Sequence, residues 1–152
     1  MLSARITEHP GVSAIFKGSV VSYANDAKVE LLGVGHDSLS QEGAVSEIVA
    51  RQMAQGVRHR FHTDWGVSIT GVAGPSGGSA DKPVGTVWIG IAGPKLVVPG
   101  SKVSDQEAHK GLAEFVEARK YFFNGDRKQI QNQSAEAAVD LLINALDVRS
   151  GS

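Results

Sequence analysis

The sequence predicts a single α/β domain in which helices cover a layered sheet. Runs rich in β-branched and aromatic residues alternate along the chain with segments whose apolar residues recur at helical spacing. Strands interleaved with amphipathic helices are typical of a layered α/β sheet. The length of 152 residues allows one domain with its own core and is too short for two of ordinary size.

The first 23 residues are expected to form a helix and a strand. Leu2 and Ile6 show helical spacing and Pro10-Gly11 closes that segment, but no capping residue precedes it, so the helix looks cut at its start. The run SAIFKGSVVSY (13–23) is rich in β-branched and aromatic residues, which favour a strand.

Two helices are predicted next. Asn25 fits the N-cap of a helix through Leu32, with Gly33 as its stop. After a polar connection, Ser46 fits the N-cap of a second helix. The apolar residues of this helix recur at every fourth position and form a core-facing stripe of Val49, Met53, Val57 and Phe61.

The second half of the chain is expected to supply three strands. Apolar runs predict buried strands over 65–72 and 84–93, with a long glycine-rich loop between them, and FVEARKYFF (115–123) predicts the third. Residues 94–114 are polar and irregular, and we expect a mobile hairpin or excursion there.

A final helix is predicted after Asn124-Gly125, ending at about Leu146. Its inner face consists of Ile130, Ala138, Leu141, Leu142 and Ala145. Residues 148–152 are expected to form a disordered tail outside a domain of residues 1–147.

Composition excludes several classes of function. The net charge of −1 gives no overall field that would draw the protein to nucleic acid or to an anionic membrane. The absence of cysteine excludes disulfides, thiolate zinc sites and a cysteine nucleophile, and the five histidines show no metal-ligand spacing. Because no signal pattern or membrane-length apolar run occurs, the cytoplasm is the expected compartment.

The loop TGVAGPSGG (70–78) is the first candidate site. It carries four glycines and a proline directly after a buried strand, which lets backbone N–H groups approach a ligand at the carboxyl end of that strand. The loop matches neither the dinucleotide fingerprint nor the Walker lysine pattern. A ligand-binding loop and an ordinary flexible turn therefore remain equal alternatives.

The stretch NGDR (124–127) is the second candidate. Asp126 can cap the final helix, Gln129 completes a capping-box spacing, and Arg127 then falls in the first turn. Free helix N–H groups beside a guanidinium suit a phosphate. A capped helix with a solvated arginine is the commoner meaning of this pattern.

The stretch YANDAK (23–28) is the third candidate. Lys28 falls at the third position of the predicted helix, where the positive end of the helix dipole lowers the pKa of an ammonium group. A neutral lysine there can act as a base beside Tyr23. Most lysines at such positions are solvated surface groups.

Five stretches, in this order, resemble the C-terminal domain of the competence/damage-inducible protein CinA: VVSYANDAKVELLGV, EGAVSEIVARQMAQGV, ITGVAGPSGG, DKPVGTVWIGIA and FNGDR. That family includes the nicotinamide-nucleotide amidases (PncC), and the resemblance covers Met1 to about Leu146 except for 94–114. It implies a three-layer α/β/α sandwich around a mixed central sheet. It also implies hydrolysis of nicotinamide mononucleotide to nicotinic acid mononucleotide and ammonia, with no metal or other cofactor.

The resemblance also implies a catalytic pair. Tyr23 and Lys28 match the two partners that activate the family's nucleophile, a serine in a Glu-Ser-Cys-Thr-Gly-Gly stretch that this sequence does not contain. We therefore expect a domain truncated at its N-terminus, which hydrolyses poorly or binds a mononucleotide without turning it over. A non-catalytic nucleotide-binding module and a competence- or damage-associated module remain alternatives.

The matching substrate-binding positions are Thr70, Gly71, Ala73, Gly74, Thr86 and Arg127. By this resemblance Arg127 contacts the phosphate, whereas Lys82 and Thr86 anchor the loop or line the pocket. A homodimer that covers an exposed sheet edge is also expected. The predicted partner is a small mononucleotide, and neither nucleic acid nor a membrane is expected to bind.

Overall fold

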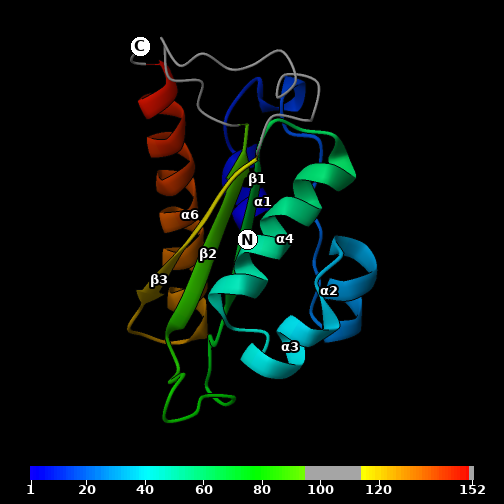
Figure 1. Ribbon diagram of the computed structural model, residues 1–152. Helices are drawn as coiled ribbons and strands as arrows, with labels where there is room; N and C mark the ends of the chain where they lie inside the picture. The colour runs from blue at the N-terminus through cyan, green and yellow to red at the C-terminus, as the bar shows by residue number, and fades with distance from the viewer. Residues whose placement is uncertain (95–113, 151–152) are drawn as a thin grey trace.

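Figure 1 shows the computed structural model of the chain, which describes residues 1–94 and 114–150. Its elements in chain order are α1 (Leu2–Thr7), the 3-10 helix η1 (Val12–Ala14), α2 (Asn25–Leu32), α3 (His36–Glu42), α4 (Glu47–Phe61), β1 (Gly66–Gly71), β2 (Thr86–Gly93), β3 (Phe115–Phe122) and α6 (Arg127–Ser150).

The described strands form one sheet with β2 between β1 and β3. Helix α4 packs on one face of this sheet and α6 on the other, with α1 against α6 and α2 against α4 (Figure 1). The expected α/β/α layering is therefore confirmed. All pairings among the described strands are antiparallel, so the parallel pairing that a mixed sheet requires does not occur among them.

The face of the sheet toward α6 holds the larger core. Val87, Ile89 and Ile91 project from alternate positions of β2 and are almost fully buried. They pack against residues of α6 that include Ile130 and Leu141, as the predicted inner face of the last helix requires. Burial of such side chains contributes roughly 1.5–3 kcal/mol each.

The opposite face is built from small residues, and α4 lies unusually close to it. A Cβ atom at Gly90 would stand 2.3 Å from the carbonyl oxygen of Ala50, so β2 can approach α4 only with glycine at this position. The hydroxyl of Ser68 on β1 donates to the same carbonyl at 2.6 Å. This close packing fixes α4, and with it α2 and α3, relative to the sheet.

The predicted strand over 13–23 is wrong. The segment forms η1 and then an extended run in which Gly18, Val20 and Ser22 are half-buried while Val21 is 86% exposed. This burial alternates as in a strand, but residues 17–23 make no backbone–backbone hydrogen bond to any residue of 1–94 or 114–150. β-branched residues favour an extended conformation, whereas a strand also needs a neighbouring strand to pair with.

The other predicted elements differ from the structure mainly at their ends. Helix α3 was expected to be a polar connection, and the N-cap of α2 is Ala24 rather than Asn25. Ser46 caps α4 through the backbone N–H of Val49, as predicted. Helix α6 continues to Ser150, past its predicted end at about Leu146. The excursion predicted at 94–114 lies almost entirely outside the described residues.

Candidate anion site

The candidate residues gather at one end of the sheet. The antiparallel register brings the end of β1, the start of β2 and the end of β3 to this end of the sheet, with Gly71 opposite Val87 and Thr86 opposite Phe122. The glycine-rich loop leaves β1 here, and α6 begins five residues after Phe122. The sequence positions that seemed unrelated are thus brought to one place by the strand order.

Arg127 joins three segments that are far apart in the sequence. Its Nη1 donates to the carbonyl oxygen of Gly74 at 2.9 Å, and its Nη2 lies at 3.5 Å from the hydroxyl oxygen of Tyr23. A guanidinium group has five N–H donors, so these two contacts leave others for a ligand. The predicted site residues Tyr23, Gly74 and Arg127 therefore meet in one site.

The start of α6 has the predicted capping box. The backbone N–H of Gln129 donates to Oδ1 of Asp126 at 2.9 Å, and the backbone N–H of Asp126 donates to Oε1 of Gln129 at 2.8 Å. This reciprocal pair fixes the first turn of the helix and thereby the position from which Arg127 reaches Gly74.

The loop conformation requires glycine at the residue that Arg127 contacts. Gly74 has φ of +73°, and a Cβ atom there would lie 2.7 Å from Cγ1 of Val84. The Gly85 N–H donates to the carbonyl of Val72 at 2.7 Å, which extends the β1–β2 ladder into the loop. The loop is therefore packed on itself at the point where its carbonyl faces Arg127.

Lys28 is buried without an acidic partner among the described residues. Only 6% of the residue is exposed, and its Nζ donates to the carbonyl oxygens of Ser22 at 2.8 Å and Tyr23 at 3.5 Å. Burial lowers the pKa of Lys28, in the direction predicted but through desolvation. Tyr23 is 84% exposed, and its contact with Lys28 is through the backbone rather than the hydroxyl.

Thr70 and Thr86 occupy this end of the sheet but do not face outward. Thr70 is buried and its Oγ1 donates to the carbonyl of Ala44 at 2.7 Å, while Thr86 is 1% exposed. Both side chains therefore lie inside the protein, at the two strand ends that the loop connects. Gly71 is exposed and Ala73 packs at the margin of the core, so these positions remain predicted substrate contacts.

A hollow of about 250 Å³ lies between α2 and α3. It is lined by Asn25, Asp26, Val29, His36, Leu39 and Ser40. It includes neither Arg127 nor Gly74, so the anion site is defined by its converging contacts rather than by this hollow. Within residues 1–94 and 114–150 no group of three or more acidic or histidine side chains could hold a metal ion.

The described helices include none with the length and apolar character needed to cross a bilayer. The layered fold, the glycine loop after β1 and the arginine at the start of α6 define an α/β domain with a candidate anion site at one sheet end. The chain belongs to the CinA C-terminal domain family, whose model matches residues 1–111.

Relatives of known sequence agree with this membership. The chain is similar to a CinA-like protein of Nostoc, with 46% identity over 142 residues that cover 93% of this chain and 32% of that protein. It is also similar to a putative competence-damage inducible protein of Halothermothrix orenii, with 52% identity over 93 residues, 61% of this chain and 22% of that protein. The chain thus spans a third or less of these curated relatives.

Solved structures share the fold. The competence/damage inducible protein CihA of Agrobacterium tumefaciens matches with a TM-score of 0.78 and 33% identity, over 94% of this chain and 76% of that one. A CinA superfamily protein of Escherichia coli matches with a TM-score of 0.76 and 25% identity, over 93% of this chain and 72% of that one. The α/β class predicted from the sequence is confirmed by these matches.

Proposed function

We propose that the chain binds a pyridine mononucleotide at the candidate anion site and belongs to an amidohydrolase of the nicotinamide mononucleotide type. The observation that carries the proposal is the contact of Arg127 with both Gly74 and Tyr23. It brings a cation at a helix N-terminus, a glycine-rich loop and an exposed aromatic hydroxyl into one site. The reaction itself is what the resemblance to nicotinamide-nucleotide amidases implies.

In this proposal the phosphate binds at Arg127. The N-terminus of α6 and the remaining guanidinium N–H groups both favour a divalent oxyanion. Gly74 supports this role because its carbonyl holds the guanidinium in place before a ligand arrives. A phosphate fixed there lowers the entropic cost of placing the amide beside the reacting groups.

The amide end of the nucleotide would lie toward Tyr23 and Lys28. Burial lowers the pKa of Lys28, which increases the fraction of neutral amine able to accept a proton. A serine hydroxyl that loses its proton to this pair attacks the carboxamide carbon, ammonia leaves, and water hydrolyses the acyl ester to the carboxylate. Backbone N–H groups of the glycine loop would stabilise the oxyanion.

Binding without turnover is the second candidate function. No serine hydroxyl of the described residues contacts Lys28 Nζ or the Tyr23 hydroxyl. Catalysis therefore needs a nucleophile that these contacts do not supply, whereas binding does not. A role in competence or in the response to damage is a further alternative, because several relatives carry those names. The net charge of −1 does not favour direct contact with nucleic acid in such a role.

One experiment separates catalysis from binding. The chain is mixed with nicotinamide mononucleotide, and ammonia release and binding heat are measured together. Release supports the amidohydrolase, and heat without release supports the binding module. Silence in both measurements would contradict the proposed function.

The phosphate contact is tested with Arg127→Ala. We expect affinity for nicotinamide mononucleotide to fall about tenfold to a hundredfold, because a charged hydrogen bond contributes roughly 1.5–3 kcal/mol. Affinity for the nucleoside, which has no phosphate, should change much less. The matched control is Lys128→Ala, which removes an exposed charge from the next residue of α6. Equal losses for nucleotide and nucleoside would remove the phosphate role from Arg127.

A further inference from the structure

The connection between α3 and α4 is held by side chains at three consecutive carbonyl groups. The carbonyl of Glu42 accepts from Nζ of Lys82, that of Gly43 from Oγ of Ser46 at 2.9 Å, and that of Ala44 from Oγ1 of Thr70 at 2.7 Å. Lys82 belongs to the glycine-rich loop and Thr70 to the end of β1. Two of the three donors thus come from the site end of the sheet.

The backbone of Lys82 is itself fixed within the loop. The Ser79 N–H donates to the Lys82 carbonyl at 3.0 Å, and the Lys82 N–H donates to Oγ of Ser79 at 3.1 Å. These reciprocal bonds close a tight turn at the far part of the loop. The backbone of Lys82 is therefore fixed to the far part of the loop.

The acceptor of Lys82 suits a cation. Glu42 is the last residue of α3, and the final carbonyl groups of a helix lack intrahelical partners and carry the negative end of its dipole. The next residue, Gly43, has φ of +73°, and a Cβ atom there would lie 3.3 Å from Lys82 Nζ. The carbonyl of Glu42 therefore attracts the ammonium group of Lys82, and the absence of a side chain at Gly43 leaves room for it.

Helix α3 is also tied to α4 at its other end. Oε1 of Gln52 accepts from the Gly35 N–H at 3.1 Å, and Nε2 of Gln52 donates to Oγ of Ser38 at 3.0 Å. Since α2 packs on α4 as well, α2, α3 and α4 form one packed unit. This unit carries Lys28 on α2, and Tyr23 lies two residues before α2. The contact of Lys82 with Glu42 joins this unit to the loop that carries Gly74.

We propose that Lys82 is a positioning residue that holds the glycine-rich loop, which carries Gly74, at a fixed position relative to α2 and α3. Without its bond to Glu42, the loop would remain attached through Arg127 but would sample other positions relative to Tyr23. The carbonyl of Gly74 would then no longer hold the guanidinium of Arg127 in a single orientation. The effect on nucleotide rests on the proposed function, whereas the effect on the loop does not.

The test compares Lys82→Met, which keeps an unbranched side chain one atom shorter and removes its donor, with Lys82→Arg, which retains a donor. The matched control is Lys128→Met, which removes an exposed charge near Arg127 without a loop contact. Amide hydrogen exchange of residues 72–85 is measured by mass spectrometry. We expect exchange in Lys82→Met to be about fivefold to tenfold faster, with wild-type rates in the other two variants.

The second measurement is the ratio of affinities for nicotinamide mononucleotide and its nucleoside. Lys82→Met should reduce this ratio, Lys82→Arg should restore it, and a merely less stable protein would keep it unchanged below its melting temperature. Unchanged exchange of 72–85 in Lys82→Met, or equal changes in Lys128→Met, would overturn the proposal. If wild-type protein binds no nucleotide, the proposed function fails, while the exchange measurement still decides the role of Lys82.

Discussion

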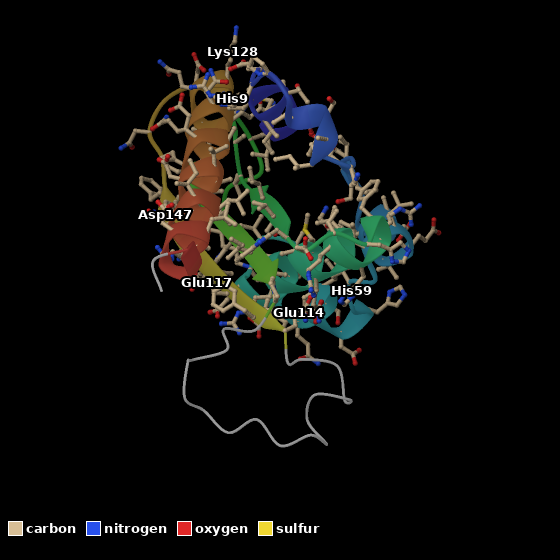
Figure 2. All side chains as sticks on the ribbon, turned by 90° about the horizontal axis from the view of Figure 1, so that it is seen from above. His9, His59, Glu114, Glu117, Lys128 and Asp147 are labelled. Carbon is tan, nitrogen blue, oxygen red and sulfur yellow. The ribbon has the colours of Figure 1, made fainter. Side chains whose placement is uncertain are left out.

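The two ends of the sheet both carry basic side chains, but they partner them differently. At the end near Gly71, Arg127, Lys28 and Lys82 bond to backbone carbonyl oxygens. At the opposite end, Arg58 is paired with the carboxylate of Glu114 at 2.5 Å. Figure 2 shows the labelled Glu114 and His59 side by side, with Lys128 on the far side of the molecule.

This difference in partners distinguishes a candidate binding site from an ion pair that stabilises the fold. A carbonyl oxygen orients a cation without neutralising it, so the positive charge of Arg127 remains available to an anion. A carboxylate cancels the charge that it orients. Burial alone raises the pKa of Glu114, but hydrogen bonds from Gln55 and Arg58, with the charges of His59 and Arg58, hold it below its usual value. The Glu114 cluster thus joins α4 to the start of β3.

The largest effect is expected from Glu114→Gln. The side chains of Arg58 and Glu114 are only 21% and 16% exposed, so the change leaves a poorly solvated guanidinium without its counter-ion. We expect the free energy of unfolding in urea to fall by about 2 kcal/mol. Affinity for nicotinamide mononucleotide should not change, because the cluster is at the other end of the sheet.

The control for this prediction is Glu117→Gln, whose partner Arg119 is 54% exposed. Its loss should stay below about 0.5 kcal/mol. The advantage of wild type over Glu114→Gln should also disappear at acid pH. The folded-state pKa of Glu114 is lowered, so its contribution is present above the unfolded value and is lost as pH falls through the folded one. An equal loss in both variants would show that the cluster is an ordinary surface ion pair.

Gly74→Ala should have the next largest effect, and it acts on the site end. The positive φ and the approach to Val84 should together cost about 1–2 kcal/mol of stability. Gly77→Ala is the matched control, since Gly77 also has positive φ but the nearest atom to its Cβ would be 3.9 Å away. Both variants should be less stable by urea unfolding, and only Gly74→Ala should lose nucleotide affinity by calorimetry. Similar affinities would show that the Gly74 carbonyl does not orient Arg127.

Local patterns predicted most of this fold. The strands β1, β2 and β3, the cap at Ser46 and the capping box of Asp126 and Gln129 each follow from neighbouring residues. The failure at 13–23 is equally physical, because pairing depends on a partner that no local pattern contains. Helix α3 was missed because the polar run HDSLSQE shows little apolar periodicity.

The candidate site was predictable in its parts but not in its contacts. Arg127 and Gly74 were selected separately, and only the strand register shows that they meet. Thr70 was predicted to contact the ligand, yet its hydroxyl donates to the carbonyl oxygen of Ala44 inside the protein. The Glu114 cluster was missed because Glu114 closes a segment that gave no periodic signal, although its partners on α4 recur at helical spacing.

The smallest expected effect is the pH dependence contributed by Lys28. Burial lowers the pKa of this lysine in the folded state, while in the unfolded chain it keeps the ordinary value of about 10.5. Between the folded and unfolded values the unfolded chain binds more protons, so the free energy of unfolding should rise as pH increases through that window. Lys28→Met should lack this rise, whereas Lys17→Met, which changes an exposed lysine, should keep it. A wild-type curve parallel to that of Lys28→Met between neutral pH and about 10 would mean that Lys28 is solvated, and the site end would then offer no candidate base.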